Sequence, residues 1–439
     1  MREERESKRS RKDQDYRNDD PFMNSQPQQN QRRSRSQGQD AQGGQQYGNG
    51  QAYGNYGGPQ PRRAAQGNQN YGQPYGGNMQ GQRADYSQGR NKKKSKRKKK
   101  RIWLFVLEIL VLLIAAAFLF LWVKYNKIQK AEFNPTDVVV NQDIDQGVVQ
   151  QMKGYTTYAF FGVDSRTGDL KSGTNSDTIM LCSINNDTKE IKLASVYRDS
   201  YLDNTNGRFQ KVTEVYGAGG AQQSLNVLNK NLDLNITQFI TVDFNAIVEA
   251  VDIFGGVDLE LTEGEVKWLN GYLVEGRDVL GKECDDVPGP GMQHLNGMQA
   301  LAYCRIRYIG LDYERTERQR KVLEQLMSKA KSADLLTLNS ALDKLLPMVY
   351  TNLDVSDMMD MLKDITSFNM GETTGFPLQK TTQNNEAGDV VVPINLAENV
   401  KELHAFLYGQ EAYTPSATVQ SISSQIVSNT GVDTGVESQ

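Results

Sequence analysis

The sequence predicts an α/β fold in which a central mixed β-sheet is flanked by helices, preceded by one transmembrane helix and a disordered N-terminal tail. Three observations support this prediction. Segments of strand and helix character are mixed after residue 153, an apolar run begins at Ile102, and the first quarter of the 439 residues is polar and of low complexity. We therefore expect one folded domain rather than two or three.

The N-terminal segment, residues 1–101, is basic and poor in aliphatic side chains. It contains 23 Lys and Arg against 9 Asp and Glu, whereas the rest of the chain contains 27 basic and 44 acidic residues. From Gln26 to Gln88 the composition offers too little apolar surface for a core, so we interpret the segment as a disordered cytoplasmic tether. Nucleic-acid binding is the less favoured alternative, and it predicts salt-sensitive affinity for RNA or DNA in a fragment of residues 1–101.

A transmembrane helix is predicted from Ile102 to Val123, because the run is apolar apart from Glu108 and matches the ~20 residues that span a bilayer. The preceding run from Lys92 to Arg101 carries nine positive charges. It predicts a cytoplasmic N-terminus and a single-pass cell-membrane protein whose C-terminal domain is extracytoplasmic. We expect an uncleaved anchor, since a cleaved signal would lie at the extreme N-terminus. A juxtamembrane linker, 124–152, follows.

The folded domain is predicted from residue 153 to residue 407. Short apolar segments predict strands over 155–164, 177–185, 190–199, 236–244 and from residue 255. Apolar residues at helical spacing predict helices over 221–232, 246–254, 295–308, 313–330 and 355–365. The last segment, 408–439, lacks a clear periodicity, and we expect it to be a disordered tail.

Few side chains are suited to thiol or imidazole chemistry. Cys182, Cys284 and Cys304 form an odd set, and the first and last lie in apolar segments, so core residues rather than a disulfide framework are expected. His294 and His404 have no spacing suited to zinc. These observations argue against a zinc site and a Ser-His-Asp triad.

Charged residues gather in places that together indicate a phosphate site. Asp164 and Asp177 flank a Gly-rich loop and could hold a hard divalent cation, although turn and capping roles are equally open. Arg198 and Asp199 stand at the end of a predicted strand. The segment 305–320, RIRYIGLDYERTERQR, supplies guanidinium groups near the first turn of a helix, where they could bind an anion together with backbone amides.

The alternative interpretation of the arginine-rich segment is a solvated helix face. It is the better one for Glu314, Glu317 and Lys321, which can pair at helical spacing. It is weaker for Arg305 and Arg307, because they directly follow the apolar segment ALAYC, which should anchor their backbone near the core.

Successive motifs of the domain resemble those of the LytR-CpsA-Psr family. They are FGVDSR, SDTIML, SVYRDS, FGGVDLEL, LNGMQALAYCRIR and DYERTERQR, in the family's order between residues 155 and 330. The resemblance implies a central sheet flanked by helices and an apolar pocket for a polyprenyl diphosphate lipid. It also implies transfer of a glycopolymer, such as a teichoic acid or capsule, to peptidoglycan.

The resemblance implies roles for individual residues. Asp164 and Asp177 resemble the family's magnesium-binding aspartates, so Mg²⁺ is the expected cofactor. The residues that resemble its diphosphate-binding and catalytic residues are Arg198, Arg305, Arg307, Arg315 and Gln319. Those expected to contact substrate are Lys211, Arg318 and Asp199. There are departures: Asn175 stands where the family usually has Arg, and Val196-Tyr197 replaces Ile-Pro. Arg166 is a candidate for the missing positive charge.

The expected reaction is phosphoryl transfer. A peptidoglycan hydroxyl, by family analogy the 6-hydroxyl of N-acetylmuramic acid, would attack the sugar-linked phosphorus, and polyprenyl phosphate would leave. Mg²⁺ and arginines would neutralise the developing charge. Asp199 and Asp164 are both candidates for the general base. The alternative is a non-catalytic envelope sensor that binds the same lipid, which the replacement at Asn175 favours.

Overall fold

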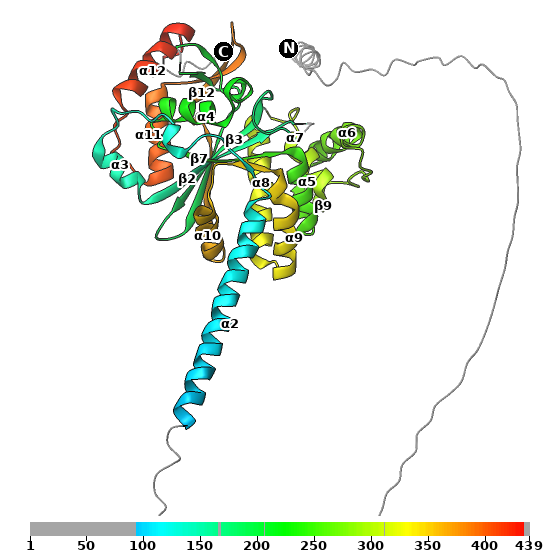
Figure 1. The fold of residues 1–439 in the computed structure, drawn as a ribbon. Helices are drawn as coiled ribbons and strands as arrows, with labels where there is room; N and C mark the ends of the chain where they lie inside the picture. The colour runs from blue at the N-terminus through cyan, green and yellow to red at the C-terminus, as the bar shows by residue number, and fades with distance from the viewer. Residues whose placement is uncertain (1–93, 166–167, 206, 311, 434–439) are drawn as a thin grey trace, which may run out of the picture. The chain divides into compact units, whose positions relative to one another are not determined.

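The computed structural model describes residues 94–165, 168–205, 207–310 and 312–433 (Figure 1). The chain divides into two compact units, Met1–Ser87 and Gln88–Gln439, and all described residues belong to the second. Most of the predicted N-terminal tail, and also Arg166, therefore lie outside the described residues.

A seven-stranded mixed sheet forms the centre of the domain. Its strands are β1 (Gln129–Lys130), β2 (Tyr155–Val163), β3 (Ser176–Asn185), β4 (Glu190–Val196), β7 (Gln238–Asp243), β10 (Val349–Thr351) and β11 (Asn369–Phe376). The spatial order is β1-β10-β7-β2-β3-β4-β11. β3 is antiparallel to both β2 and β4, whereas β2 and β7 are parallel. The predicted fold class is confirmed. The first three predicted strands correspond to β2, β3 and β4, which are neighbours in the sheet.

Side chains alternate between the two faces of this sheet, as the pleat requires. Phe161, Leu181 and Val196 belong to a core cluster on one face, whereas Tyr158 and Met180 belong to a cluster on the other. The first cluster includes residues from α4 (Thr213–Leu232), α11 (Leu396–Tyr408), α12 (Ala417–Thr430) and α3 (Gln146–Met152). The second includes residues from α8 (Asp312–Ser332) and α10 (Val355–Asp364). The sheet is thus covered on both faces.

A further core cluster lies beside the sheet, at the right of Figure 1. It is formed by α5 (Phe244–Ile253), the hairpin of β8 (Val257–Leu261) and β9 (Gly291–Leu295), α6 (Glu263–Leu280), α7 (Gly297–Arg305) and part of α8. The remaining elements are η1 (Pro135–Asp137), α9 (Leu335–Leu345), η2 (Leu346–Met348) and the hairpins of β5 (Tyr201–Asp203) with β6 (Phe209–Lys211) and β12 (Lys380–Asn385) with β13 (Gly388–Pro393).

The apolar run forms the last part of α2 (Lys94–Tyr125). Within the described chain, one helix is long and apolar enough to cross a membrane; it is Phe105–Tyr125, with a mean hydropathy of 2.8. This agrees closely with the predicted span. The predicted linker, in contrast, is partly folded, because β1 pairs with β10 and adds an edge strand to the sheet.

The prediction of a disordered tail after residue 407 is wrong for most of that segment. Val419, Ile422 and Ile426 of α12 are at most 2% exposed and join the main core. Their spacing of three and four residues is helical, but the Ser and Gln residues between them hid it. Ser416 caps the helix by accepting a hydrogen bond from the backbone N–H of Val419 at 3.1 Å. The folded domain therefore extends to about Thr430.

Candidate active site

The sheet topology brings the first set of predicted site residues together. β2 ends at Val163, which pairs with Ser176 at the start of β3, and the end of β4 pairs with the same part of β3. Because β3 is antiparallel to both neighbours, Asp164, Asp177 and Arg198 lie at the same end of the sheet. Asp177 and Arg198 follow Asp164 by 13 and 34 positions in the sequence, yet all three residues lie at one site.

Asp177 lies between two guanidinium groups. Its Oδ1 accepts a hydrogen bond from Arg198 Nη1 at 2.6 Å, and its Oδ2 lies 3.7 Å from Arg307 Nη2. Burial alone would raise the pKa of Asp177, but Arg198, Arg315 and Arg307 together hold it below the usual value. Burial likewise opposes the charge on Arg198, yet Asp177 and the neighbouring carboxylates raise its pKa overall. Asp177 and Arg198 are therefore both held in their charged forms.

Arg315 completes this cluster from the first turn of α8. Its Nη2 donates to the backbone carbonyl of Asp177 at 2.6 Å and lies 3.0 Å from Asp312 Oδ1, and its side chain is 2% exposed. A buried guanidinium held by two acceptors has little freedom to move. It connects the arginine-rich segment to the end of the sheet.

Asp199 lies between Arg198 and Lys211. Its Oδ2 is 3.4 Å from Arg198 Nε, and its Oδ1 is 3.4 Å from Lys211 Nζ at the end of β6. The backbone carbonyl of Asp199 accepts a hydrogen bond from the N–H of Val391 on β13 at 2.8 Å. The predicted residues Asp177, Arg198, Asp199, Lys211, Arg307 and Arg315 therefore form one connected charged cluster.

Arg305 makes its contacts away from Asp177. Its Nη2 lies 3.3 Å from Glu275 Oε1 on α6, and its guanidinium carbon lies 5.5 Å and 5.4 Å from the ring centroids of Phe244 and Tyr272. Cation–π contacts of this kind hold a guanidinium at an aromatic surface. Its predicted catalytic role stays a prediction.

Arg318 contacts the loop that carries Arg307, and Gln319 contacts the end of α7 just before that loop. Arg318 Nη2 donates to the carbonyls of Ile306 at 2.7 Å and Ile309 at 3.2 Å, and burial lowers the pKa of Arg318. Gln319 Nε2 donates to the carbonyl of Cys304 at 3.5 Å. These contacts support a positioning role for both residues, while the substrate-binding and catalytic roles expected for them stay predictions.

Asp164 and Asp177 stay the predicted ligands of a magnesium ion that also takes ligands from a substrate. Among the described residues no group of three or more His, Cys, Asp or Glu could hold a metal. Mg²⁺ is commonly bound through one or two carboxylates together with phosphate oxygens, which is what Asp164 and Asp177 could offer. The lowered pKa of Asp177 keeps that carboxylate deprotonated, as metal binding requires.

The three cysteines are free, and Cys182 and Cys304 are buried, as predicted. Burial raises the pKa of each of these two thiols to about 12. His294 lies on the surface, with its Nδ1 2.7 Å from Asp258 Oδ1. Neither cysteine nor histidine takes part in the charged cluster.

Some neighbours of the site were not predicted from the sequence. Lys380 Nζ lies 5.0 Å and 4.4 Å from the ring centroids of Tyr197 and Tyr313. These two tyrosines are close in the sequence to Arg198 and Arg315. Burial lowers the pKa of Lys380. Lys380 lies outside the recognised motifs, so only the fold could place it here. Asn175, the departure from the family pattern, lies against α4, because a Cβ on Gly217 would be 2.9 Å from its Oδ1.

Comparison with known proteins gives consistent results. The family model described as "LytR_cpsA_psr family" matches residues 121–403. The chain is 29% identical over 204 residues to the polyisoprenyl-teichoic acid–peptidoglycan teichoic acid transferase TagU of Bacillus licheniformis, covering 46% of this chain and 60% of that protein. It is 27% identical over 290 residues to Biofilm regulatory protein A of Streptococcus mutans, covering 56% and 68%. The alignment thus spans about three fifths of the transferase's length.

The fold also matches a solved structure. A crystal structure from Enterococcus faecalis, described as a transcriptional regulator, superimposes with a TM-score of 0.50 at 22% identity, covering 65% of this chain and 98% of that one. At this identity the match shows the fold alone. Since the family model covers well over half of the sequence, the chain belongs to the LytR-CpsA-Psr family.

Proposed function

We propose that this protein is a phosphotransferase that moves a glycopolymer from a polyprenyl-diphosphate carrier to peptidoglycan and releases polyprenyl phosphate. The acceptor group, by family analogy, is the 6-hydroxyl of N-acetylmuramic acid. The observation that carries the proposal is the convergence of Arg198, Arg307 and Arg315 on Asp177 at one end of the sheet. The name of the TagU relative, a teichoic acid transferase, supports it.

The charged cluster suits phosphoryl transfer because this chemistry depends mainly on positioning and on electrostatic stabilisation. Arg198 and Arg307 would bind the diphosphate oxygens as negative charge moves to the leaving phosphate. Arg315 is fixed by Asp312 and by the backbone of Asp177, so it would hold the site in shape. A magnesium ion held by Asp164 and Asp177 would supply further neutralisation of the diphosphate.

The proposed location is the outer side of the cell membrane. One candidate span directly precedes the domain, and the basic run before it favours a cytoplasmic N-terminus. A lipid-linked donor in the outer leaflet and peptidoglycan would then both be within reach of the domain. The charged cluster would face substrates that an intracellular domain could not meet.

The test is a transfer assay with the full chain in nanodiscs that contain a synthetic polyprenyl-diphosphate oligosaccharide. Peptidoglycan oligomers and Mg²⁺ are added, and covalent attachment of glycan is followed by mass spectrometry. We expect transfer together with release of polyprenyl phosphate. Binding of the lipid without transfer, for several kinds of glycan, would contradict the proposal.

Magnesium binding is expected to depend on the diphosphate, because the site offers two carboxylates and one of them already faces two arginines. Isothermal titration of Mg²⁺ into the lipid-free protein should show weak binding, and the affinity should rise at least tenfold when a short-chain polyprenyl diphosphate is present. Asp164→Asn should remove this increase. Equal affinity with and without the diphosphate would show that magnesium binds elsewhere.

The alternative function is a non-catalytic sensor that binds the lipid diphosphate and signals through the span. Asn175, which replaces the family's usual Arg, and the name of the Biofilm regulatory protein A relative favour it. The two functions differ in their need for the N-terminal segment. A variant without residues 1–90 should retain full transfer activity if the protein is an enzyme, whereas a sensor would show no turnover in either form.

A further inference from the structure

Two adjacent leucines at the start of α9 are exposed to an unusual degree. Leu335 and Leu336 are each 83% exposed, and no large apolar side chain among those described is more exposed, not even in the candidate span. They follow α8 directly, and Asp334 caps α9 by accepting a hydrogen bond from the N–H of Thr337 at 2.7 Å. A well-ordered helix start therefore presents two large apolar side chains outward.

The contacts of α9 with α2 show where these leucines lie along the span. Lys127 Nζ is 2.5 Å from Asp343 Oδ1, and Lys124 Nζ reaches both Asp343 Oδ1 at 2.6 Å and Asn339 Oδ1 at 2.8 Å. Lys127 lies in the turn after α2, so moving from Asp343 to Asn339 along α9 corresponds to moving from Lys127 back to Lys124 in the last turn of α2. The two helices run in the same direction, and the first turn of α9 lies toward the span.

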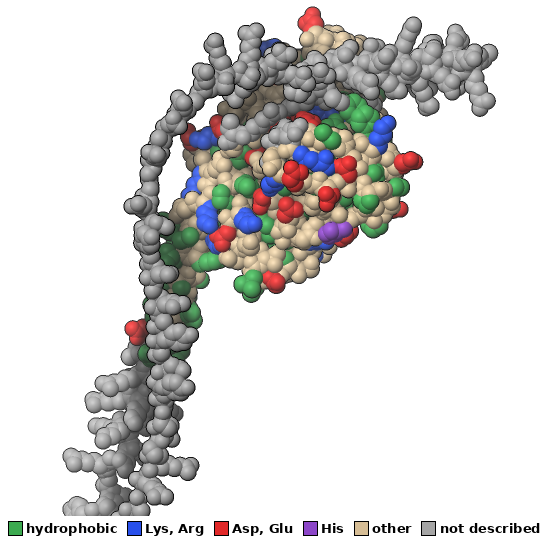
Figure 2. All heavy atoms as spheres, turned by 90° about the vertical axis from the view of Figure 1, so that its right-hand side faces the viewer, with side chains coloured by type: hydrophobic (Ala, Val, Ile, Leu, Met, Phe, Trp, Pro, Cys, Tyr) green, Lys and Arg blue, Asp and Glu red, His purple; other side chains and the backbone are tan. Residues whose placement is uncertain are grey.

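The level of the leucines follows from helix geometry. Leu335 precedes Asn339 by four residues, which corresponds to about 6 Å along a helix axis. That distance places it beside the C-terminal part of the candidate span, Phe105–Tyr125, near the level of Phe120. Figure 1 shows the lower end of α9 reaching down beside the upper part of α2. Figure 2 shows hydrophobic side chains at the lower edge of the domain, on the face that it presents.

The surroundings have the composition of a membrane interface. Trp122 and Tyr125 lie at the outer end of the span, where aromatic residues are enriched. Lys329 and Lys331 stand in the last turn of α8, close in the chain to the leucines. Lys329 Nζ lies 3.1 Å from Asp258 Oδ2, and Lys331 Nζ donates to the carbonyl of Phe368 at 2.5 Å, so both ammonium groups have partners within the domain and the comparison with an interface rests on the aromatic residues.

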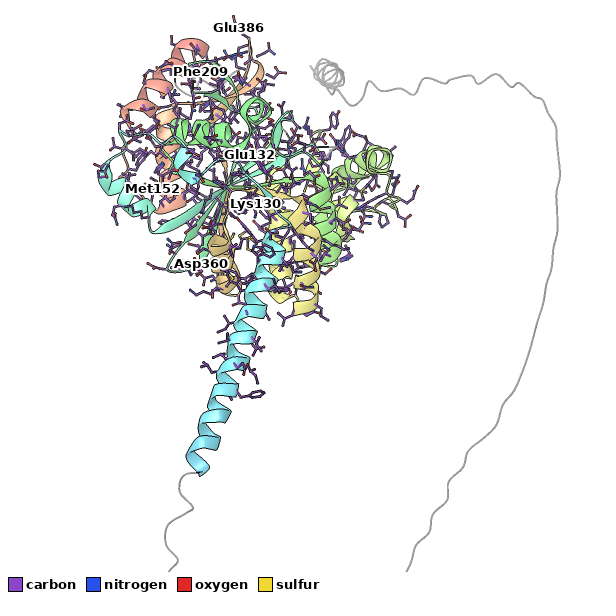
Figure 3. All side chains as sticks on the ribbon, viewed as in Figure 1. Lys130, Glu132, Met152, Phe209, Asp360 and Glu386 are labelled. Carbon is purple, nitrogen blue, oxygen red and sulfur yellow. The ribbon has the colours of Figure 1, made fainter. Side chains whose placement is uncertain are left out.

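Acidic side chains limit how deep this end of the domain can lie. Figure 3 shows Asp360 on α10 at the lower end of the domain, from which α2 leaves. A carboxylate is tolerated among headgroups but not in hydrocarbon. The turn would therefore reach the acyl boundary with its leucines only.

We propose that Leu335 and Leu336 insert into the outer leaflet and form a second membrane contact beside the span. This rests on the proposed membrane anchoring and orientation, but not on transferase activity. A span alone would let the domain tilt, whereas two contacts restrict its tilt. The charged cluster at the end of the sheet would then keep one orientation toward lipid-linked substrates.

The test measures lipid exposure of single labelled positions in the full chain. Cys284 is replaced by Ser, and the remaining thiols, Cys182 and Cys304, are buried with pKa values raised to about 12, so they should not react. Leu335→Cys and Leu336→Cys are labelled with an environment-sensitive fluorophore in nanodiscs of phosphatidylcholine and phosphatidylglycerol. Met292→Cys, on β9 and 68% exposed, is the matched control, and Ile114→Cys reports insertion of the span.

We expect doxyl-labelled lipids to quench the label at both leucine positions at least twofold more than at Met292→Cys, and aqueous iodide to quench it less. Quenching equal to that at Met292→Cys by both agents would place the turn in water and overturn the proposal. Shielding from both agents would indicate a protein contact and would also overturn it. Loss of lipid quenching at Ile114→Cys would instead show that the anchoring itself had failed.

Discussion

Arg198→Ala is expected to lower the rate of glycopolymer transfer by about 10²–10³-fold, the usual cost of removing one donor that stabilises transition-state charge. Arg198 is held by Asp177 and Asp199 at 2.6 Å and 3.4 Å, so its guanidinium is already oriented before substrate binds. Its loss also leaves Asp177 with less opposing charge near the diphosphate. The rate constant and the Michaelis constant are measured in nanodiscs at saturating Mg²⁺.

The matched control is Lys321→Ala on α8, which removes a cation whose side chain is 49% exposed and pairs with Glu317. It should change transfer less than twofold, because a screened surface charge contributes little. Arg198→Lys should recover only part of the activity, since an ammonium lacks the planar guanidinium fork that contacts Asp177 and Asp199 through separate nitrogens. Wild-type turnover in Arg198→Ala would rule out this cluster as the site of phosphoryl transfer.

Asp233→Ala is expected to destabilise the domain by about 3–5 kcal/mol. The buried Asp233 carboxylate accepts hydrogen bonds from the Tyr413 hydroxyl, from both the N–H and the Oγ of Ser416, and from Asn141 Nδ2. Removing it leaves these donors without an acceptor and releases the segment that leads into α12. Chemical unfolding, followed by circular dichroism of the full chain in detergent, gives the change in free energy.

Asp187→Ala is the control for this substitution, because Asp187 lies in the exposed turn between β3 and β4. Its effect should stay within about 0.5 kcal/mol, as is usual for surface positions. A loss of less than 1 kcal/mol in Asp233→Ala would mean that α12 is held by its apolar face alone. Residues 417–430 would then contribute little to the stability of the domain, as expected from their polar composition.

The strands were predictable because their signal is local. β2, β3 and β4 were expected within a few residues of their observed bounds, since short apolar runs between turns identify them without knowledge of the rest of the chain. The helix expected from residue 221 is the second part of α4, which also has a first helical segment from Thr213. Gly220 has a non-helical backbone, with φ at 65°, and separates the two segments, so the break predicted at these glycines is confirmed.

Long-range contacts could not be predicted in the same way. Asn175 was recognised as a departure, but its position against Gly217 depends on how α4 packs on the loop before β3. Lys380 and α12 lie outside the motifs, and their places beside Tyr197 and on the core depend on folding of the last third of the chain. The local pattern of apolar and polar residues does not indicate which distant segments will be in contact.

By itself the sequence determined the single apolar span, the mixed α/β class and the identity of the charged residues, because these follow from run length, local period and residue type. Only the tertiary structure decided which charges meet. Arg198 and Arg315 reach Asp177 from 21 and 138 positions away in the sequence, and α9 meets the span through Lys124, which is 215 positions from Asn339. Such pairings depend on strand register and helix packing, which bring distant segments together.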